Sequence, residues 1–312
     1  DQLPEPQKQQ KESKKEQNAQ IRAEQELAKR ILSRKRMLPF VEKFNPDYQA
    51  GWVHKDICQR LEKFSQDVAE KKSPRLMLFM PPRHGKSELA SRCFPAWHLG
   101  HNPRHEIISC SYSGALSMTF SRRVRAMMRD SEYRLLFKGT SLDPDSQSIE
   151  AWLTTEGGGL VSSGVGGAIT GRGAHILLID DPTKNREEAE SETTRQSIKD
   201  WYTSTAYTRL APGGGVLLIQ TRWHMDDLAG FLLAEQETGG DEWNITSYPA
   251  IAEEDETYRL EGQALHPERY PIEALERIKR AVGVRDWFAL YQQSPVSDDG
   301  AYFTRPMLKY YD

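Results

Sequence analysis

The chain has 312 residues, of which 38% are hydrophobic and 28% are charged, and its net charge is -3. This length suits one large α/β domain with appendages. The net charge argues against a protein that coats nucleic acid with its whole surface, so any contact with nucleic acid needs a local basic patch.

The cysteines and the apolar runs indicate the compartment. The three cysteines form no CxxC pair, which is typical of free thiols in a reducing cytoplasm. No apolar run approaches the roughly 20 residues that cross a bilayer, and the N-terminus lacks the layout of a signal peptide. We therefore expect a chain that acts in the cytoplasm without a membrane partner.

Residues 1–36 are poor in apolar residues and rich in Gln, Glu, Lys and Arg. Such a segment cannot bury enough surface to fold alone. A helix over residues 18–36 would carry only a thin apolar stripe. We expect a solvated, charged arm that a neighbouring molecule could order, and a disordered tail without a role is an equal alternative.

From residue 37 onward the pattern is that of an ordered α/β domain. Apolar residues at helical spacing predict helices over residues 54–71, 86–99, 115–129, 187–208 and 227–237. Apolar runs predict strands over residues 75–80, 106–110, 175–179, 215–220 and 243–248, with two short strands flanking residues 156–159. Continuously apolar strands that alternate with helices indicate a mainly parallel central sheet with helices on both faces.

The alternation stops after about residue 248. Residues 251–266 have the composition of an irregular linker, and residues 271–291 predict two short helices. We therefore divide the chain into a charged arm (1–36), a core domain (37–250), a small helical lid or linker subdomain (251–303) and the start of a further domain (304–312).

One strand is followed by a glycine-containing loop and then by a helix. The loop reads Met80-Pro81-Pro82-Arg83-His84-Gly85-Lys86-Ser87, with Met80 where the usual phosphate-loop pattern has glycine. In a strand–loop–helix unit the first N–H groups of the helix point at phosphates. Gly85 would allow close approach of the backbone, Lys86 would contact the β- and γ-phosphates, and Ser87 would ligate Mg²⁺.

The residues around this motif complete a predicted nucleotide site for ATP and Mg²⁺. Pro82, His84 and Glu88 belong to the same phosphate-binding segment. Arg83 is a second cation that could reach the γ-phosphate, and a plain surface arginine is an even alternative.

A pair of acids follows another predicted strand. Residues 175–179 are mainly apolar and lead into Asp180, Asp181 and a proline. Asp180 would hold Mg²⁺, and Asp181 would orient or deprotonate the attacking water. An acidic helix cap is the alternative interpretation. The reserve candidates for the base are Glu187, Glu188 and Glu190.

The order of the strands along the chain indicates which class of ATPase the sequence resembles. A complete strand–helix unit over residues 106–129 separates the loop from the acids, as in ring and motor ATPases, where an inserted strand lies between the two. The strand over residues 215–220 ends in Gln220 and Thr221. Both are candidate sensors of the γ-phosphate, or ordinary residues at a strand end.

Taken together, these segments resemble the large terminase subunit of tailed bacteriophages. The resemblance rests on residues 81–87, 178–182 and 220–224, and on the Trp-Phe-Ala-Leu-Tyr-Gln-Gln-Ser-Pro segment at 287–295. It implies a P-loop fold of the motor type and a motor that couples ATP hydrolysis to translocation of double-stranded DNA into a procapsid. It also implies a portal protein, a small terminase subunit and neighbouring copies in a ring as partners, although the isolated domain could be monomeric.

The resemblance also implies roles for individual residues. Arg172 matches the arginine finger that acts on a neighbouring subunit's site, with Arg209 and Arg222 as the next candidates. Tyr48 and Gln49 match an adenine-recognising pair. The family's nuclease domain uses clustered aspartates, and nothing after residue 303 supplies them, so we expect no nuclease activity from this chain.

Two other interpretations of function stay open at this stage. The first is a helicase-like ATPase that remodels nucleic acid, and the second is an ATP-binding assembly module without turnover. Four arginines on one predicted helix (Arg122, Arg123, Arg125 and Arg129) could follow a phosphate backbone or form a solvated helix face. The glycines at 157–159 and 164–167 would allow that loop to change shape with the nucleotide state.

Overall fold

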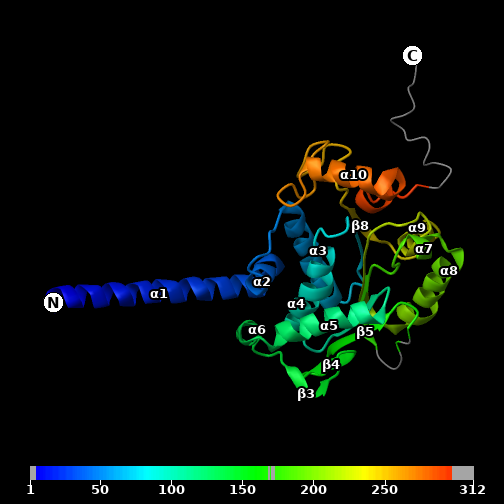
Figure 1. The fold of residues 1–312 in the computed structure, drawn as a ribbon. Helices are drawn as coiled ribbons and strands as arrows, with labels where there is room; N and C mark the ends of the chain where they lie inside the picture. Colours follow the sequence, from blue (N-terminus) through cyan, green and yellow to red (C-terminus); the bar gives the residue numbers. More distant parts are fainter. Residues whose placement is uncertain (1–4, 168, 170–172, 297–312) are drawn as a thin grey trace.

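The computed structural model describes residues 5–167, 169 and 173–296 of the chain. The N-terminal helix α1 (Glu5–Lys35) projects from the body as a rod (Figure 1). The helices that follow are α2 (Met37–Phe44), α3 (Trp52–Ala69), the π-helical η1 (Glu88–Cys93), α4 (Phe94–His101), α5 (Gly114–Arg129), α6 (Ser131–Leu136), α7 (Arg186–Glu190), α8 (Glu192–Trp201), η2 (Tyr202–Ala206), η3 (Tyr207–Arg209), α9 (Leu228–Glu237), α10 (Ile272–Asp286) and η4 (Trp287–Tyr291).

One eight-stranded sheet organises the body. The strands are β1 (Arg75–Phe79), β2 (Glu106–Ser111), β3 (Leu142–Gln147), β4 (Ala151–Thr154), β5 (Gly159–Gly164), β6 (Ala174–Asp180), β7 (Leu210–Gln220) and β8 (Asn244–Ser247). Their order in the sheet is β3-β4-β5-β2-β6-β7-β1-β8. The β3–β4 and β4–β5 pairs are antiparallel and all others are parallel, which confirms the predicted mainly parallel α/β fold.

Both faces of the sheet are covered by helices because the central strands are apolar on both sides. Along β6, Ile176 and Leu178 point into the cluster formed with α2 to α6, whereas Leu177 and Ile179 point into the cluster formed with α8, η2 and α9. These four side chains have no exposed surface. Successive side chains of a strand point to opposite faces, so an unbroken apolar run is what a doubly covered strand requires.

The sheet order corrects the expectation that the strand of the unit over residues 106–129 lies between the loop and the acids. The strand between the loop-bearing β1 and the acid-bearing β6 is β7, and β2 lies on the other side of β6. An inserted strand does separate the two motifs, but it is the strand that carries Gln220 and Thr221. The C-terminal ends of β1, β6 and β7 therefore lie side by side at one edge of the sheet.

Two predicted helices are interrupted. The helix predicted over residues 86–99 contains η1, which ends just before Pro95 in α4. A proline has no N–H to give to the turn before it, so the helical register changes there. The helix predicted over 187–208 is divided at Ser191, whose side chain accepts a hydrogen bond from the Thr194 N–H and begins α8.

Strand predictions failed at two places. β3 was not predicted, because Asp143 and Asp145 hide its pattern at the edge of the sheet. β7 begins at Leu210, five residues before the prediction. The Pro212-Gly213-Gly214 segment has the composition of a loop, yet Leu210 pairs with Ala174 across an irregular register.

The arm is helical over a longer range than predicted. Its second half is held to the body by ion pairs, in which Lys43 of α2 lies 2.9 Å from both Glu26 and Glu132, and Arg30 lies 3.1 Å from Glu132. The apolar side chains of the predicted stripe are about half exposed (Ile21, Leu27, Ile31 and Leu32). Ordering by a neighbour stays a prediction.

Residues 251–296, here called the C-terminal lid, pack around their own small apolar cluster with Leu275 and Trp287. Gly283 (φ +80°) breaks the helical path inside α10, so the two predicted helices are present but nearly continuous. Figure 1 shows α10 at the top of the view, apart from the arm. Within the described residues no helix is long and apolar enough to cross a membrane.

The central position of β6 leads to a first prediction. Leu178→Ala should lower the free energy of unfolding by about 2–5 kcal/mol, because a fully buried leucine leaves a cavity on truncation. Denaturant titration measures this loss. Leu260→Ala, at a leucine that is 60% exposed, is the matched control and should change stability by less than about 0.5 kcal/mol. Equal losses in the two variants would contradict the assigned core.

Candidate functional site

The loop after β1 has the backbone geometry of a tight turn. Arg83 and Gly85 both have positive φ, at +61° and +95°. A Cβ at Gly85 would lie 2.9 Å from the Tyr48 hydroxyl, so any side chain there meets both strain and a steric clash. Glycine is therefore required at this position, as the motif predicted.

Two buried histidines hold the loop in shape. His54 accepts the Gly51 N–H at Nδ1 (2.8 Å), so its proton is on Nε2, which donates to the His84 carbonyl (3.0 Å). His84 in turn donates from Nδ1 to the Pro82 carbonyl (2.9 Å). Burial lowers the pKa of His54 and of His84 to about 4, which keeps both rings neutral. The two histidines thus satisfy loop carbonyls that would otherwise be unpaired.

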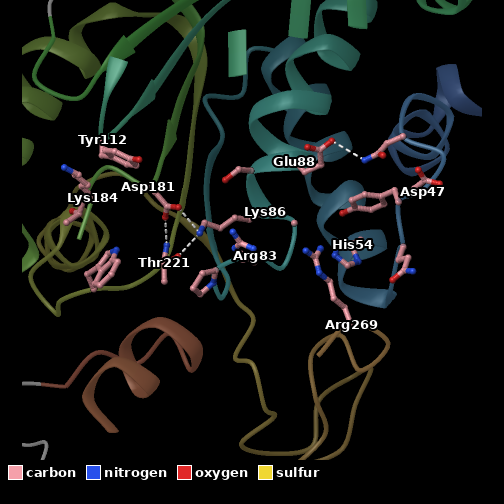
Figure 2. A pocket seen from close by; sticks show the side chains of 18 residues that line it. Asp47, His54, Arg83, Lys86, Glu88, Tyr112, Asp181, Lys184, Thr221 and Arg269 are labelled. Carbon is pink, nitrogen blue, oxygen red and sulfur yellow. Dashed lines mark hydrogen bonds and ion pairs between the residues drawn. The ribbon is translucent and has the colours of Figure 1, made fainter. Parts of the chain in front are cut away.

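Lys86 connects the loop to the ends of β6 and β7. Its ammonium lies 2.8 Å from Asp181 Oδ2 and donates to Thr221 Oγ1 at 2.6 Å. The Thr221 N–H donates to Asp181 Oδ1 at 2.8 Å, which closes a triangle of three residues (Figure 2). Asp181 has a positive φ of +45°, a backbone strain that is concentrated at functional sites.

Asp180 lies behind this triangle and is almost fully buried. Its two carboxylate oxygens accept hydrogen bonds from the Ser87 hydroxyl (3.1 Å) and the Ser91 hydroxyl (2.5 Å). Burial raises the pKa of Asp180 above its ordinary value, and the adjacent Asp181 charge raises it further. A cation at this carboxylate would oppose both effects.

The oxygen donors fit a magnesium ion. Among the described residues no group of three or more His, Cys, Asp and Glu side chains could hold a metal. Mg²⁺ binds to proteins through one or two oxygen ligands and keeps water and substrate phosphates as the rest. The Ser87 hydroxyl and the Asp180 carboxylate supply such a minimal donor set.

A cavity of about 730 Å³ opens in front of the loop. Figure 2 shows Lys86 in its middle, with Tyr112, Asp181, Lys184 and Thr221 to one side and Asp47, His54 and Arg269 to the other. The predicted site residues that line it are Tyr48, Gln49, Pro82, Arg83, Gly85, Lys86, Ser87, Glu88, Asp181 and Thr221. Segments more than 170 residues apart in the sequence therefore converge on one cavity.

Some predicted residues lie elsewhere. His84 faces the C-terminal lid, and Asp180 is hidden behind Ser87 and Ser91. Gln220 is buried beside Asp227 rather than in the cavity lining. The side chains of His84 and Gln220 are therefore directed away from the cavity, and their contact with a nucleotide stays a prediction.

The reserve candidates are also outside the cavity lining. Glu188 accepts the Lys184 N–H, and Glu190 pairs with Arg186 and Arg285. Glu187 is exposed on α7. Of the carboxylates considered as the base, Asp181 alone lines this cavity.

The arginine candidates have different positions. Arg222 pairs with Asp227 (2.9 Å) and lies over the Phe79 ring, beside the site but outside the cavity lining. Arg209 precedes β7, at the opposite end of that strand from Gln220. Arg172, the first choice, lies outside the described residues.

On α5, Arg122 and Arg123 are exposed, and Arg123 lies 4.0 Å from Glu88.

Sequence reasoning missed the other residues that line the cavity. They are Asn45, Asp47, His54, Tyr112, Thr183, Lys184, Trp223 and Arg269. Lys184 follows the 178–182 segment by two residues and Trp223 lies inside the 220–224 segment, so proximity to those motifs was a usable signal. Arg269 comes from the C-terminal lid, and no sequence pattern links it to the loop.

The fold and the site define an α/β protein with a mostly parallel sheet flanked by helices and a cavity at the C-terminal ends of its strands. The sequence pattern of the family described as "Terminase large subunit, T4likevirus-type, N-terminal" matches residues 77–310, more than half of the chain. The chain therefore belongs to the large terminase subunit family. No curated protein matches the sequence.

Solved structures of large terminases are similar to the chain at low identity. An ATPase-domain mutant from Thermus phage P74-26 has 12% identity and a TM-score of 0.47, over 75% of this chain and 93% of that one. Large terminase from a thermophilic bacteriophage matches in complex with ATP-gamma-S (9% identity, TM-score 0.41) and with ADP (8%, 0.40). Both matches cover 72% of this chain and 51% of the other. The family assignment rests on the sequence match.

The neutral histidines predict a pH dependence of stability. Their pKa is about 4 in the folded chain and about 6.5 in an unfolded one, so the unfolded state binds more protons between these values. The free energy of unfolding should therefore fall as the pH drops from 6.5 to 4, by up to roughly 3 kcal/mol per histidine.

Denaturant titrations at several pH values measure this fall. His84→Phe keeps an aromatic ring against the lid and removes one titrating group, so its acid slope should be shallower than that of the unaltered chain. His224→Phe, at a more exposed histidine, is the control and should change the slope less. An unaltered slope in His84→Phe would contradict the neutral state assigned to this ring.

Proposed function

We propose that this chain is the ATP-hydrolysing motor domain of a large terminase subunit and couples hydrolysis to the movement of double-stranded DNA into a procapsid. The observation that carries the proposal is the Lys86–Asp181–Thr221 triangle beside the Ser87–Asp180 pair. It places a cation, a carboxylate and a candidate metal site at one end of a cavity large enough for a nucleotide.

Lys86 is the residue we assign to the β- and γ-phosphates of ATP. Its ammonium is buried and already paired with Asp181. A phosphate group attracts an ammonium more strongly than one carboxylate does, because it carries more charge and more acceptor oxygens. Binding of the γ-phosphate would therefore draw Lys86 away from Asp181.

Asp181 is the residue we assign to the attacking water. Once Lys86 is drawn to phosphate, the carboxylate keeps the Thr221 N–H and gains a free oxygen that can accept a proton from water. Thr221 thus holds Asp181 in place while its hydroxyl contacts Lys86. Ser87 and Asp180 would hold Mg²⁺, which neutralises developing charge on the phosphates.

Two further assignments follow from family membership. Tyr48 and Gln49 line the cavity. The Tyr48 ring contacts the His54 ring, which lies on the side of Lys86 away from Asp181 (Figure 2), where the base of a nucleotide would lie. Arg172 is proposed as the arginine finger for a neighbouring copy's site. DNA, a portal protein, a small terminase subunit and copies of the chain in a ring on the portal are the proposed partners, in the host cytoplasm.

Asp181→Asn tests the catalytic assignment. Turnover of ATP should fall by about 10²–10⁴-fold because the amide cannot accept the proton, whereas nucleotide affinity should change only a few-fold. Phosphate release and equilibrium binding measure the two quantities. Asp145→Asn, on the exposed edge strand β3, is the matched control and should keep full turnover.

The same two measurements distinguish an ATP-hydrolysing motor from an assembly module that binds ATP without turnover. Nucleotide binding without any turnover in the unaltered chain would favour a module that uses ATP only to fix a docking surface. DNA-stimulated turnover that depends on the portal complex supports packaging. Stimulation by single-stranded nucleic acid alone would favour the helicase-like alternative.

Mixing two inactive variants of the chain tests whether Arg172 acts on the site of a neighbouring copy. Arg172→Ala chains keep an intact loop, and Lys86→Ala chains keep Arg172. In a ring of both, some sites combine a working loop with a neighbour's Arg172, so the mixture assembled on the portal should hydrolyse ATP faster than either variant alone. Additive rates of the two variants would rule out action between neighbours.

A further inference from the structure

A short turn of the C-terminal lid is fixed directly against the phosphate loop. His266 accepts the N–H groups of Arg269 (3.1 Å) and Tyr270 (2.8 Å) at its carbonyl, which closes the turn. The His266 ring contacts the His54 ring edge-on, with 4.7 Å between centroids. The Tyr270 ring stacks on His84 at 4.5 Å and 24°.

These two contacts lie on either side of Arg269. The histidines they touch are the same two that hold the carbonyls of the loop in place. Residue 266 is thus positioned by α3 and residue 270 by the loop, and the position of Arg269 between them follows from that. Figure 2 shows its side chain directed from the lid toward His54 and the cavity.

Arg269 is the lid residue that lines the cavity. Its side chain is exposed, and none of the ion pairs found among the described residues includes it. Its guanidinium lies 5.7 Å from the centre of the Tyr270 ring, within the range of a cation–π contact. The site described above makes no use of this group.

The position of Arg269 along the cavity indicates which part of a nucleotide its guanidinium would contact. Asp181 and Thr221 define the γ-phosphate end, and Lys86 and Ser87 define the phosphate centre. Arg269 lies beyond Lys86 on the opposite side, together with His54 (Figure 2). The Tyr48 ring contacts the His54 ring, with 5.3 Å between centroids. A planar guanidinium at that end can stack on the face of a base, since arginine stacks on flat π systems.

We propose that Arg269 binds the base of the nucleotide by stacking, so that the bound nucleotide joins the lid to the core domain. This inference rests on the proposed function, because it needs a nucleotide in this cavity. Stacking on a π face does not depend on which base is present. Arg269 therefore supplies affinity for the base, whereas recognition of adenine falls to the Gln49 amide.

Equilibrium binding to three probes tests the proposal, namely ATP, GTP and inorganic tripolyphosphate. Arg269→Ala should weaken ATP and GTP by a similar factor, about 2- to 30-fold, and leave tripolyphosphate unchanged. Arg269→Lys keeps the charge but loses the flat group, so it should follow Arg269→Ala for ATP. Arg280→Ala, an exposed arginine on α10 outside the cavity lining, is the control and should bind all three as before.

The outcomes separate this inference from the proposed function. Equal weakening of ATP and tripolyphosphate in Arg269→Ala would place the guanidinium on phosphate and overturn base stacking. Unchanged ATP affinity would also overturn it, provided that Lys86→Ala loses binding. If Lys86→Ala bound all probes normally, the nucleotide site itself would be wrong.

Discussion

The side-by-side arrangement of the C-terminal ends of β1, β6 and β7 is the constraint on which the rest of the structure depends. Parallel strands bring their carboxyl ends to one edge. β6 and β7 end in polar residues, and β1 leads into the loop that carries Lys86. Lys86 then bonds to both neighbouring ends, through Asp181 and Thr221. Because the strands are fixed by apolar burial on both faces, the polar groups at their ends need little adjustment to meet.

Buried neutral histidines provide a second level of organisation. His54 belongs to α3 and His84 to the loop, yet each satisfies a loop carbonyl. The C-terminal lid packs on both rings, so the loop, α3 and the lid share one contact region. A shift in any one of them changes the environment of the others, which is a physical basis for coupling the nucleotide site to segments beyond it.

The charged residues divide into two groups with different roles. Lys43, Glu26 and Glu132 hold the arm to the body through exposed or half-buried ion pairs, which contribute little stability each. Asp180 and Lys86 are buried, and leaving either one without a partner would be costly. Both are paired in the structure, Asp180 with the Ser87 and Ser91 hydroxyls and Lys86 with Asp181 and Thr221.

The sequence by itself determined the parallel α/β class, the loop with its required Gly85, the two acids at the end of β6 and the family. These features depend on residues that are neighbours along the chain, because an apolar run and the turn that follows it can be recognised within one short segment. It did not reveal the interruption before Pro95, the edge strand β3 or the early start of β7, where local composition and tertiary pairing disagree.

The tertiary structure decided which distant segments meet. It placed β7 between β1 and β6, directed His84 to the lid instead of the cavity, and removed Gln220 from the lining. It also brought Arg269 to the same cavity as Lys86, although 183 positions separate the two in the numbering. Such contacts depend on how packed layers lie against each other, and no periodicity along the chain encodes that.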